Sequence, residues 1–148
     1  MKDEKRRDLG YKVSKINTLK FSFEDIGENH FENLQKDEGI LEIGLNIGIL
    51  ISEDESTISV DVSSNLKNLK DDIVLVNHMA RTIFKIRGLP ETKDSEEGFF
   101  NLPDGFIVQL YSIAYSHARA LLAVELSPTV YKDKFILPIV DPTKFLKK

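Results

Sequence analysis

The feature that most constrains the fold is a run of alternating apolar residues at positions 43–51. Every odd position in this run is isoleucine or leucine, whereas the intervening positions include Gly44, Asn46 and Gly48. A period of two is typical of a β-strand that buries one face. Gly44 and Gly48 leave two positions of the other face without side chains, so another backbone can approach there. The run therefore predicts a strand with one aliphatic face.

Two further stretches continue this pattern. Residues 58–63 alternate in the same way after an acidic turn at 52–55, which predicts a β-hairpin with one polar face. Residues 73–87 are rich in apolar and β-branched residues of mixed phase. Such a mixture is expected of a strand that is covered on both faces or carries a bulge.

A fourth strand is predicted ahead of these three, at residues 11–23. Its apolar side chains lie mainly at odd positions, but Ile16 falls out of phase, so we expect a bulge or break near residues 15–18. The polar, turn-rich residues 26–39 then predict a long connection rather than a tight hairpin.

A long helix is predicted after a charged loop at residues 89–102. Pro103 and Asp104 begin the helix, because proline is tolerated in the first turn and an acidic side chain is favoured there. Ser127-Pro128 ends it near Leu126, because the residue before a proline avoids the helical conformation.

The predicted helix carries two apolar stripes. One contains Phe106, Leu110, Ile113, His117, Leu121 and Val124. The second contains Ile107, Tyr111, Ala114, Ala118 and Leu122. A helix that lies on a sheet needs a single apolar stripe, about 100° wide. Because a chain of 148 residues has little material left to cover the second stripe, we predict that these five residues form an oligomer interface.

We therefore expect an α+β fold, with a four-stranded antiparallel sheet followed by a long helix packed on it, in an oligomeric protein. One domain spans residues 1–148, with a charged N-terminal extension at 1–10 and a short basic tail at 142–148. This length supports one continuous core. The segment from Tyr131 onward is expected to be a short second helix, an edge segment or a tail.

Composition argues against several functional classes. Twenty Lys and Arg against 24 Asp and Glu leave a net charge of −4, without the basic surplus of a general nucleic-acid binder. The absence of cysteine removes disulfides and thiolate metal sites. Residues 1–8 are charged rather than apolar, unlike a signal peptide, and residues 106–126 hold polar groups too costly for a membrane span. We expect a cytoplasmic protein.

Catalytic motifs are absent from the sequence. There is no phosphate-binding glycine loop, dinucleotide fingerprint, zinc-protease motif or nucleophile elbow. His30, His78 and His117 each lack a second histidine at ligand spacing, which favours structural or surface roles. We therefore predict no enzymatic activity, no cofactor and no metal site.

Apolar residues outside the regular strands and helix are the remaining candidates for function. They are Phe31 and Leu34 in one loop, Phe99 and Phe100 in another, and Tyr131 and Phe135 after the helix. Either they form a satellite core, or they line a groove for extended apolar peptide segments. Burying one aromatic side chain is worth about 1.5–3 kcal/mol. A single contact therefore binds weakly, whereas several grooves on an oligomer gain by effective concentration.

The order of elements and several stretches of sequence resemble the SecB family of protein-export chaperones. Residues 76–86 (VNHMARTIFKI) resemble the last long strand of the family, with its Ile-Phe-x-Ile ending at residues 83–86. Residues 115–119 (YSHAR) lie where the family has Phe-Pro-Tyr-Ala-Arg. Residues 136–146 resemble its closing Leu-x-Pro-x-x-Phe stretch, and residues 18–24 its first strand.

The resemblance implies a homotetramer built as a dimer of dimers. It implies a chaperone that holds unfolded or partly folded protein clients, without ATP, in long apolar grooves between sheet and helix. It also suggests docking to the SecA motor. Phe84, in the Ile-Phe match, joins the candidate client-binding residues.

The sequence also departs from the family pattern. Arg81-Thr82 replaces a glycine, Ser116 replaces the helix proline, and the zinc-binding tail that contacts SecA has no counterpart. These departures weaken the case for SecA as a partner. The alternatives are a SecB-fold oligomeric adaptor and a chaperone dedicated to a single partner, such as an antitoxin, without a general export role.

Overall fold

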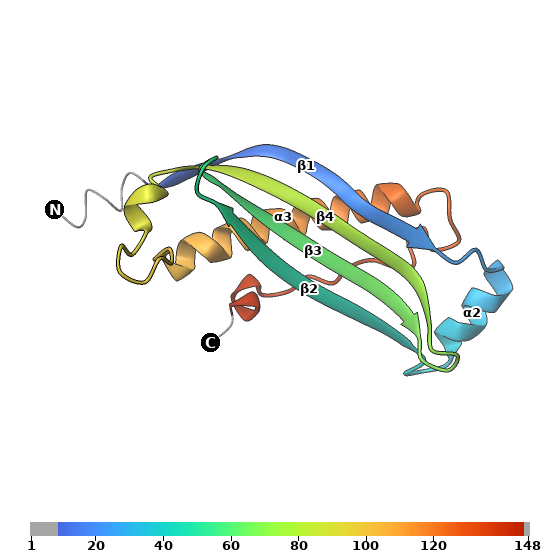
Figure 1. Ribbon diagram of the computed structural model, residues 1–148. Helices are drawn as coiled ribbons and strands as arrows, with labels where there is room; N and C mark the ends of the chain where they lie inside the picture. The colour runs from blue at the N-terminus through green and yellow to red at the C-terminus, as the bar shows by residue number, and fades with distance from the viewer. Residues whose placement is uncertain (1–8, 147–148) are drawn as a thin grey trace.

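The computed structural model describes residues 9–146, and its core element is the expected four-stranded antiparallel sheet (Figure 1). The strands are β1 (Gly10–Phe23), β2 (Leu41–Ser52), β3 (Thr57–Asn68) and β4 (Ile73–Arg87). Their spatial order is β1-β4-β3-β2, so the first strand pairs with the last and β1 and β2 are the two edges. The predicted α+β fold is confirmed.

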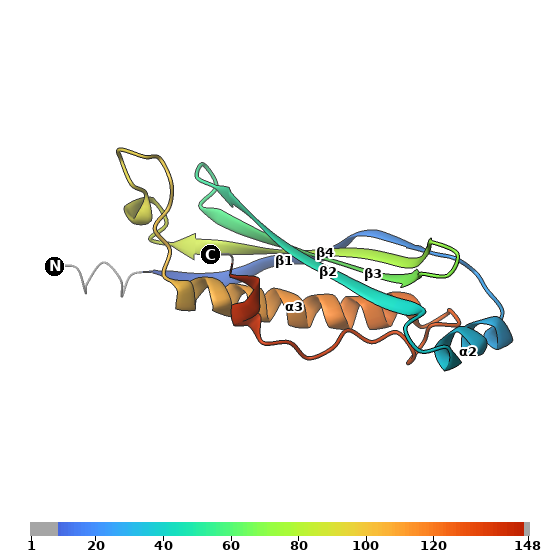
Figure 2. The same cartoon turned by 90° about the horizontal axis from the view of Figure 1, so that it is seen from below.

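One face of the sheet carries the core. Ile58, Val60 and Val62 of β3 are fully buried, and Ile47 of β2 lies opposite Val62 in the register. The long helix α3 (Asp104–Leu126) lies on this face (Figure 2). None of the elements described within residues 9–146 covers the other face. On that face Asp61 of β3 forms an ion pair with Arg81 of β4, at 2.7 Å.

Strand β1 is irregular on both sides of the position predicted for a break. Its register with β4 shifts between Val13 and Lys15 and again between Thr18 and Lys20. Each shift moves the side chains by one position. The two shifts explain why Ile16 lies out of phase with the apolar residues before and after it.

Residues 26–39 form a long connection, as expected, but the placement of Phe31 and Leu34 in a loop was wrong. Nine of these residues form helix α2 (Glu28–Lys36), which lies at one end of the sheet (Figure 1). Phe31 and Leu34 are three positions apart, so they share one helix face, and both are buried. The polar composition of the segment hides this short amphipathic pattern.

The ends predicted for the long helix are confirmed, because α3 runs from Asp104 to Leu126. After α3 the chain turns and runs back beside it (Figure 2), ending in the 3₁₀ helix η2 (Pro142–Phe145). The returning segment covers Tyr111 and Tyr115 on the flank of α3. The premise that the chain has too little material left to cover the second stripe was therefore wrong.

Most of the residues predicted for an oligomer interface are buried by the chain itself. They are Tyr111, Ala114, Ala118 and Leu122, with Ile107 partly buried beside them. Their participation in an oligomer stays a prediction. The domain boundaries also stay predictions, since residues 1–8 and 147–148 lie outside the described part of the chain.

Candidate functional site

An apolar groove of about 460 Å³ lies between β2 and the first half of α3. It is lined by Ile47, Gly48, Ile49 and Ile51 of β2, Ile107 and Tyr111 of α3, Phe100 and Leu102 of the loop before α3, and Phe145 and Leu146 near the C-terminus. The groove has the size of a typical ligand pocket. Among the described residues, no carboxylate, ammonium, guanidinium or imidazole group lines it. Its chemistry therefore suits apolar side chains.

The position of β2 explains why the groove is open on one side. All twelve residues of β2 pair with β3 without a register shift. The regular alternation places Ile47, Ile49 and Ile51 on the same face as α3. Because β2 is an edge strand, no further strand among the described residues closes the groove beyond it.

Phe100 is positioned by the loop that precedes α3. Lys93 and Phe100 form an isolated antiparallel bridge, and the amide of Asp94 donates to the carbonyl of Phe99 at 2.7 Å. Lys93 Nζ also lies 2.8 Å from Glu53 Oε2 in the β2–β3 turn. These contacts connect the loop to the end of the hairpin and direct Phe100, which is mostly buried, into the groove.

Two tyrosines of α3 lie beneath the returning C-terminal segment. The ring of Phe145 lies 6.1 Å from that of Tyr111 and 5.9 Å from that of Tyr115. Burial raises the pKa of both tyrosines. The Tyr115 hydroxyl donates to the carbonyl oxygen of Pro138. Aromatic surface therefore continues from the groove along the flank of α3.

The sequence-predicted client-binding residues divide into two groups. Phe100 lines the groove, and Phe99 beside it is 46% exposed. The other five, Phe31, Leu34, Phe84, Tyr131 and Phe135, are at most 7% exposed and belong to the core. The structure does not bring all seven together. Their roles in client binding stay predictions. The satellite-core alternative, which did not include Phe84 of β4, describes where the other four lie.

The core position of Tyr131 illustrates this second group. Its hydroxyl donates to the carbonyl oxygen of Glu24 at 2.8 Å, and its ring lies 5.0 Å from that of Phe31. Burial, with the nearby charges of Glu24 and Asp25, raises the pKa of Tyr131 to about 12. Tyr131 therefore joins the segment after α3 to α2 and to the end of β1.

Sequence reasoning did not assign several lining residues to a site. The signal was present for β2, because Ile47, Ile49 and Ile51 alternate clearly. Their placement beside Leu102 and Leu146 depends on which edge of the sheet β2 occupies, and local periodicity carries no such information.

Two histidines lie between the sheet and α3. His78 of β4 is buried, with Nε2 3.2 Å from Thr18 Oγ1, and His117 of α3 has Nδ1 2.9 Å from Thr82 Oγ1. Burial lowers the pKa of both imidazoles. Within residues 9–146, no three His, Asp or Glu side chains gather closely enough to hold a metal ion.

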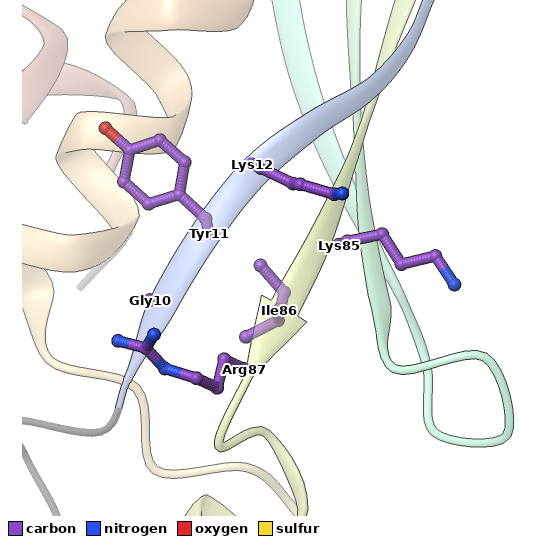
Figure 3. A pocket seen from close by; sticks show the side chains of 6 residues that line it. All are labelled: Gly10, Tyr11, Lys12, Lys85, Ile86 and Arg87. Carbon is purple, nitrogen blue, oxygen red and sulfur yellow. The ribbon is translucent and has the colours of Figure 1, made fainter.

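A second hollow of about 350 Å³ lies where the start of β1 meets the end of β4 (Figure 3). Gly10, Tyr11 and Lys12 line it from β1, and Lys85, Ile86 and Arg87 line it from β4. Lys12 and Lys85 are register partners, and both ammonium groups extend to the same side of the sheet. This cationic corner suits apolar segments less well than the groove beside β2.

No family model matches the sequence, and no curated protein matches it. Among solved structures, the chain is similar to the SecB-like chaperone Rv1957 of Mycobacterium tuberculosis, solved in complex with a ChAD peptide from the Rv1956 HigA1 antitoxin. The TM-score is 0.52 at 11% identity, over 88% of this chain and 90% of that chain. A protein of unknown function from Streptococcus agalactiae has a TM-score of 0.41 at 9% identity, over 89% and 98% of the two chains.

The similarity to the mycobacterial structure concerns the fold, and this chain has a SecB-like fold. A membrane-spanning helix, which must be both long and strongly apolar, is not found in the described part of the chain.

Proposed function

We propose that the chain is a cytoplasmic chaperone that holds unfolded or partly folded polypeptide segments, without ATP, in the groove between β2 and α3. The observation that carries the proposal is the groove itself, which is lined by apolar side chains and open along the sheet edge. The SecB-like fold supports it, because a chaperone with that fold has been solved with a peptide bound.

The physical chemistry of the groove matches an extended apolar client. Three aliphatic side chains of β2 lie along one strand at alternate positions, about 6–7 Å apart. An extended peptide repeats its own side chains at the same spacing. Each apolar side chain buried contributes roughly 1.5–3 kcal/mol before ordering costs. Such a site holds many sequences weakly and needs no bound cofactor.

A second candidate is a chaperone dedicated to one partner, or an oligomeric adaptor. It is favoured by the antitoxin peptide in the mycobacterial complex. The two candidates differ in client range. A general chaperone holds several unrelated unfolded proteins, whereas a dedicated one ignores them. SecA-dependent export is the weaker alternative, because of the sequence departures from the SecB family.

Self-association belongs to the proposal as well, and we propose a second face of α3 for it beside the stripe predicted from the sequence. The outward face of α3 is exposed and uncharged, with Ser112, Ser116, Ala120 and Ala123 in line and Val124 69% exposed. A dimer, or a dimer of dimers, that joins through α3 would use this face, because the stripe with Ala118 is already buried.

The test is suppression of aggregation by the full chain. Two unrelated denatured reporters are diluted into buffer with near-stoichiometric protein, without ATP, and light scattering is followed. Suppression of both reporters supports a general holding chaperone. Failure with both, together with capture of one native partner, supports the dedicated chaperone. Failure in all three measurements refutes the proposal.

A matched pair of variants locates the activity. Phe100→Ser removes a groove side chain, whereas Phe99→Ser makes the same change next to it and outside the groove lining. If a client buries the part of the Phe100 ring that remains accessible, the loss is about 1 kcal/mol, or roughly fivefold in Kd. We expect Phe99→Ser to have a smaller effect. Equal losses would place the client on the loop rather than in the groove.

A further inference from the structure

The face of the sheet that α3 does not cover carries lysines from the two strands β1 and β4. Phe84 and Ile86 of β4 are buried on the core face, so Lys85 between them points to the uncovered face. Lys12 of β1 is the register partner of Lys85, and partners on neighbouring strands share a face. The ammonium groups of these two lysines extend to the same side of the sheet (Figure 3).

The two register shifts of β1 bring Lys15 and Lys20 to the same face. The first shift makes Lys15 the partner of Ile83, and the second makes Lys20 the partner of Met79. Both partners lie an even number of residues from Lys85 along β4 and therefore share its face. Without the first shift Lys15 would point toward the core, and with the first shift alone Lys20 would do so. The irregularity of β1 thus aligns its lysines.

These four residues, Lys12, Lys15, Lys20 and Lys85, are here called the lysine stripe. All four are exposed, and among the described residues no carboxylate forms an ion pair with any of their ammonium groups. Strand β1 contains no acidic residue. Asp61, which shares the uncovered face, is paired with Arg81 through both carboxylate oxygens, at 2.7 and 2.8 Å. A chain with a net charge of −4 therefore concentrates positive charge along one sheet edge.

The spacing of the lysine stripe suits an extended polypeptide with acidic side chains. Successive positions on one face of a strand are about 6–7 Å apart. Lys12 and Lys15 occupy two adjacent positions of this kind in the register, and Lys20 lies two positions further along. An extended peptide repeats its own side chains at the same interval. Ile83 and Met79, half-buried beside the lysines, offer contacts to the aliphatic parts of such side chains.

A nucleic acid fits the lysine stripe less well than a polypeptide does. Proteins that bind single strands add aromatic side chains on which the bases stack. Tyr11, Phe21 and Phe23 of β1 are not available for this role, because their rings contact Phe84, His78 and Tyr131 on the core face.

A flat anionic membrane also fits less well. The β2–β3 turn and the loop at residues 89–102 project on the uncovered side of the sheet (Figure 2), and both are rich in Asp and Glu. A flat anionic surface would meet these acidic groups together with the lysines. A single polypeptide segment can instead follow β1 and avoid them.

We infer that the lysine stripe is a second binding surface, which takes an acidic polypeptide segment along β1. The inference goes beyond the proposed function, because the stripe lies on the opposite face of the sheet from the apolar groove and shares no residue with it. Each exposed ion pair contributes little by itself. Binding therefore depends on several contacts at once, and it weakens as salt screens them.

The test is binding of fluorescein-labelled poly-L-glutamate to the full chain, followed by fluorescence anisotropy at neutral pH. An ionic strength of about 0.01 M keeps screening low. The stripe variant is Lys12→Gln/Lys15→Gln/Lys20→Gln. The matched control is Lys36→Gln/Lys70→Gln/Lys132→Gln, which removes three exposed lysines elsewhere and leaves the same net charge. We expect the stripe variant to bind about tenfold more weakly than the control.

Two further variants separate the charge of the stripe from the fold and from the groove. Lys12→Arg/Lys15→Arg/Lys20→Arg keeps the charges and should bind poly-L-glutamate like the parent. Phe100→Ser changes the groove and should also bind it like the parent, whereas the stripe variant should still suppress aggregation of the denatured reporters. Thermal unfolding monitored by circular dichroism verifies that each variant folds.

Equal affinities of the stripe variant and the control would overturn the inference, as would a folded parent that does not bind poly-L-glutamate. Labelled oligo(dT) and vesicles that contain phosphatidylserine are the competing probes. Tighter binding of either probe by the parent, lost in the stripe variant, would assign the stripe to a nucleic acid or to a membrane and would also overturn the inference. The aggregation assay tests the groove separately, so failure of the stripe leaves the proposed function in place.

Discussion

Arginine substitutions at two nearby positions of α3 test which face of the helix packs in the core and which face points outward. Ala118 is fully buried against the sheet, whereas Ala120, two residues later, is exposed. The space around position 118 is filled, so fitting an arginine side chain there costs about 1–3 kcal/mol of unfolding free energy. Its charge, without a carboxylate partner, adds several kcal/mol or forces the side chain outward. We expect Ala118→Arg to lose at least about 4 kcal/mol of unfolding free energy.

The same substitution at Ala120 should leave the fold intact. An exposed site changes stability by about 0.5 kcal/mol or less. If copies of the chain meet through the outward face of α3, Ala120→Arg instead places positive charge into that contact and splits the oligomer.

For Ala118→Arg, the loss in unfolding free energy should lower Tm by roughly 8–16 °C, because the Tm of a chain of this length shifts by about 2–4 °C per kcal/mol.

Two measurements distinguish these outcomes. Thermal unfolding reports the loss in Ala118→Arg, and size-exclusion chromatography with light scattering reports the mass of Ala120→Arg. A parental Tm for Ala118→Arg would refute the assignment of that face to the core. A parental mass for Ala120→Arg, where the parent is an oligomer, would show that α3 does not mediate assembly.

Three further predictions concern stability. Tyr131→Phe should cost about 1 kcal/mol in urea unfolding, since its hydroxyl is buried and donates to a backbone carbonyl; an unchanged midpoint would contradict this bond. Acidification should destabilise the fold, because burial lowers the pKa of His78 and His117. Below about pH 6.5 the unfolded chain therefore binds protons that the folded chain does not, and the equilibrium shifts toward unfolding. Urea midpoints at pH 7.5 and 5.5 measure this loss, which should be smaller in His117→Gln. Gly44→Ala should cost about 1 kcal/mol, because its Cβ would lie 2.6 Å from a neighbouring side-chain oxygen, whereas Gly48→Ala meets nothing within 4 Å and should be close to neutral; equal midpoints for the two alanine variants would contradict the close approach at Gly44.

Local patterns predicted the elements whose determinants are local. Pro103-Asp104 and Ser127-Pro128 predict the ends of α3 to within a residue, although Ser127 itself keeps helical φ and ψ angles of −50° and −41°. The irregularity of β1 follows from the phase of Ile16 alone. Helix α2 was missed because two apolar residues among nine give a weak periodic signal.

Features that depend on distant parts of the chain were not predictable in this way. The helix stripe with Ala118 has the apolar composition of an oligomer interface. Its burial is visible only when the sheet is in place in the folded structure. The covering of Tyr111 by Phe145 depends on where the chain returns after α3. For the candidate site, Phe100 was found from its loop position, whereas Ile49 required the order of the strands.

The pairing of the first strand with the last has a consequence for how the protein folds. Phe23 lies opposite Val76 and Gly10 opposite Arg87, so the β1–β4 ladder joins residues that are far apart in the sequence. The β2–β3–β4 meander forms from neighbours, whereas β1 has to close a long loop, and such closure slows folding. During synthesis, β1 leaves the ribosome before β4 and has no strand to pair with until β4 has been made. In this interval Tyr11 and Phe21 lack their final partners. The nascent chain therefore passes through a stage in which the β1 segment, with its apolar side chains, is exposed and unpaired.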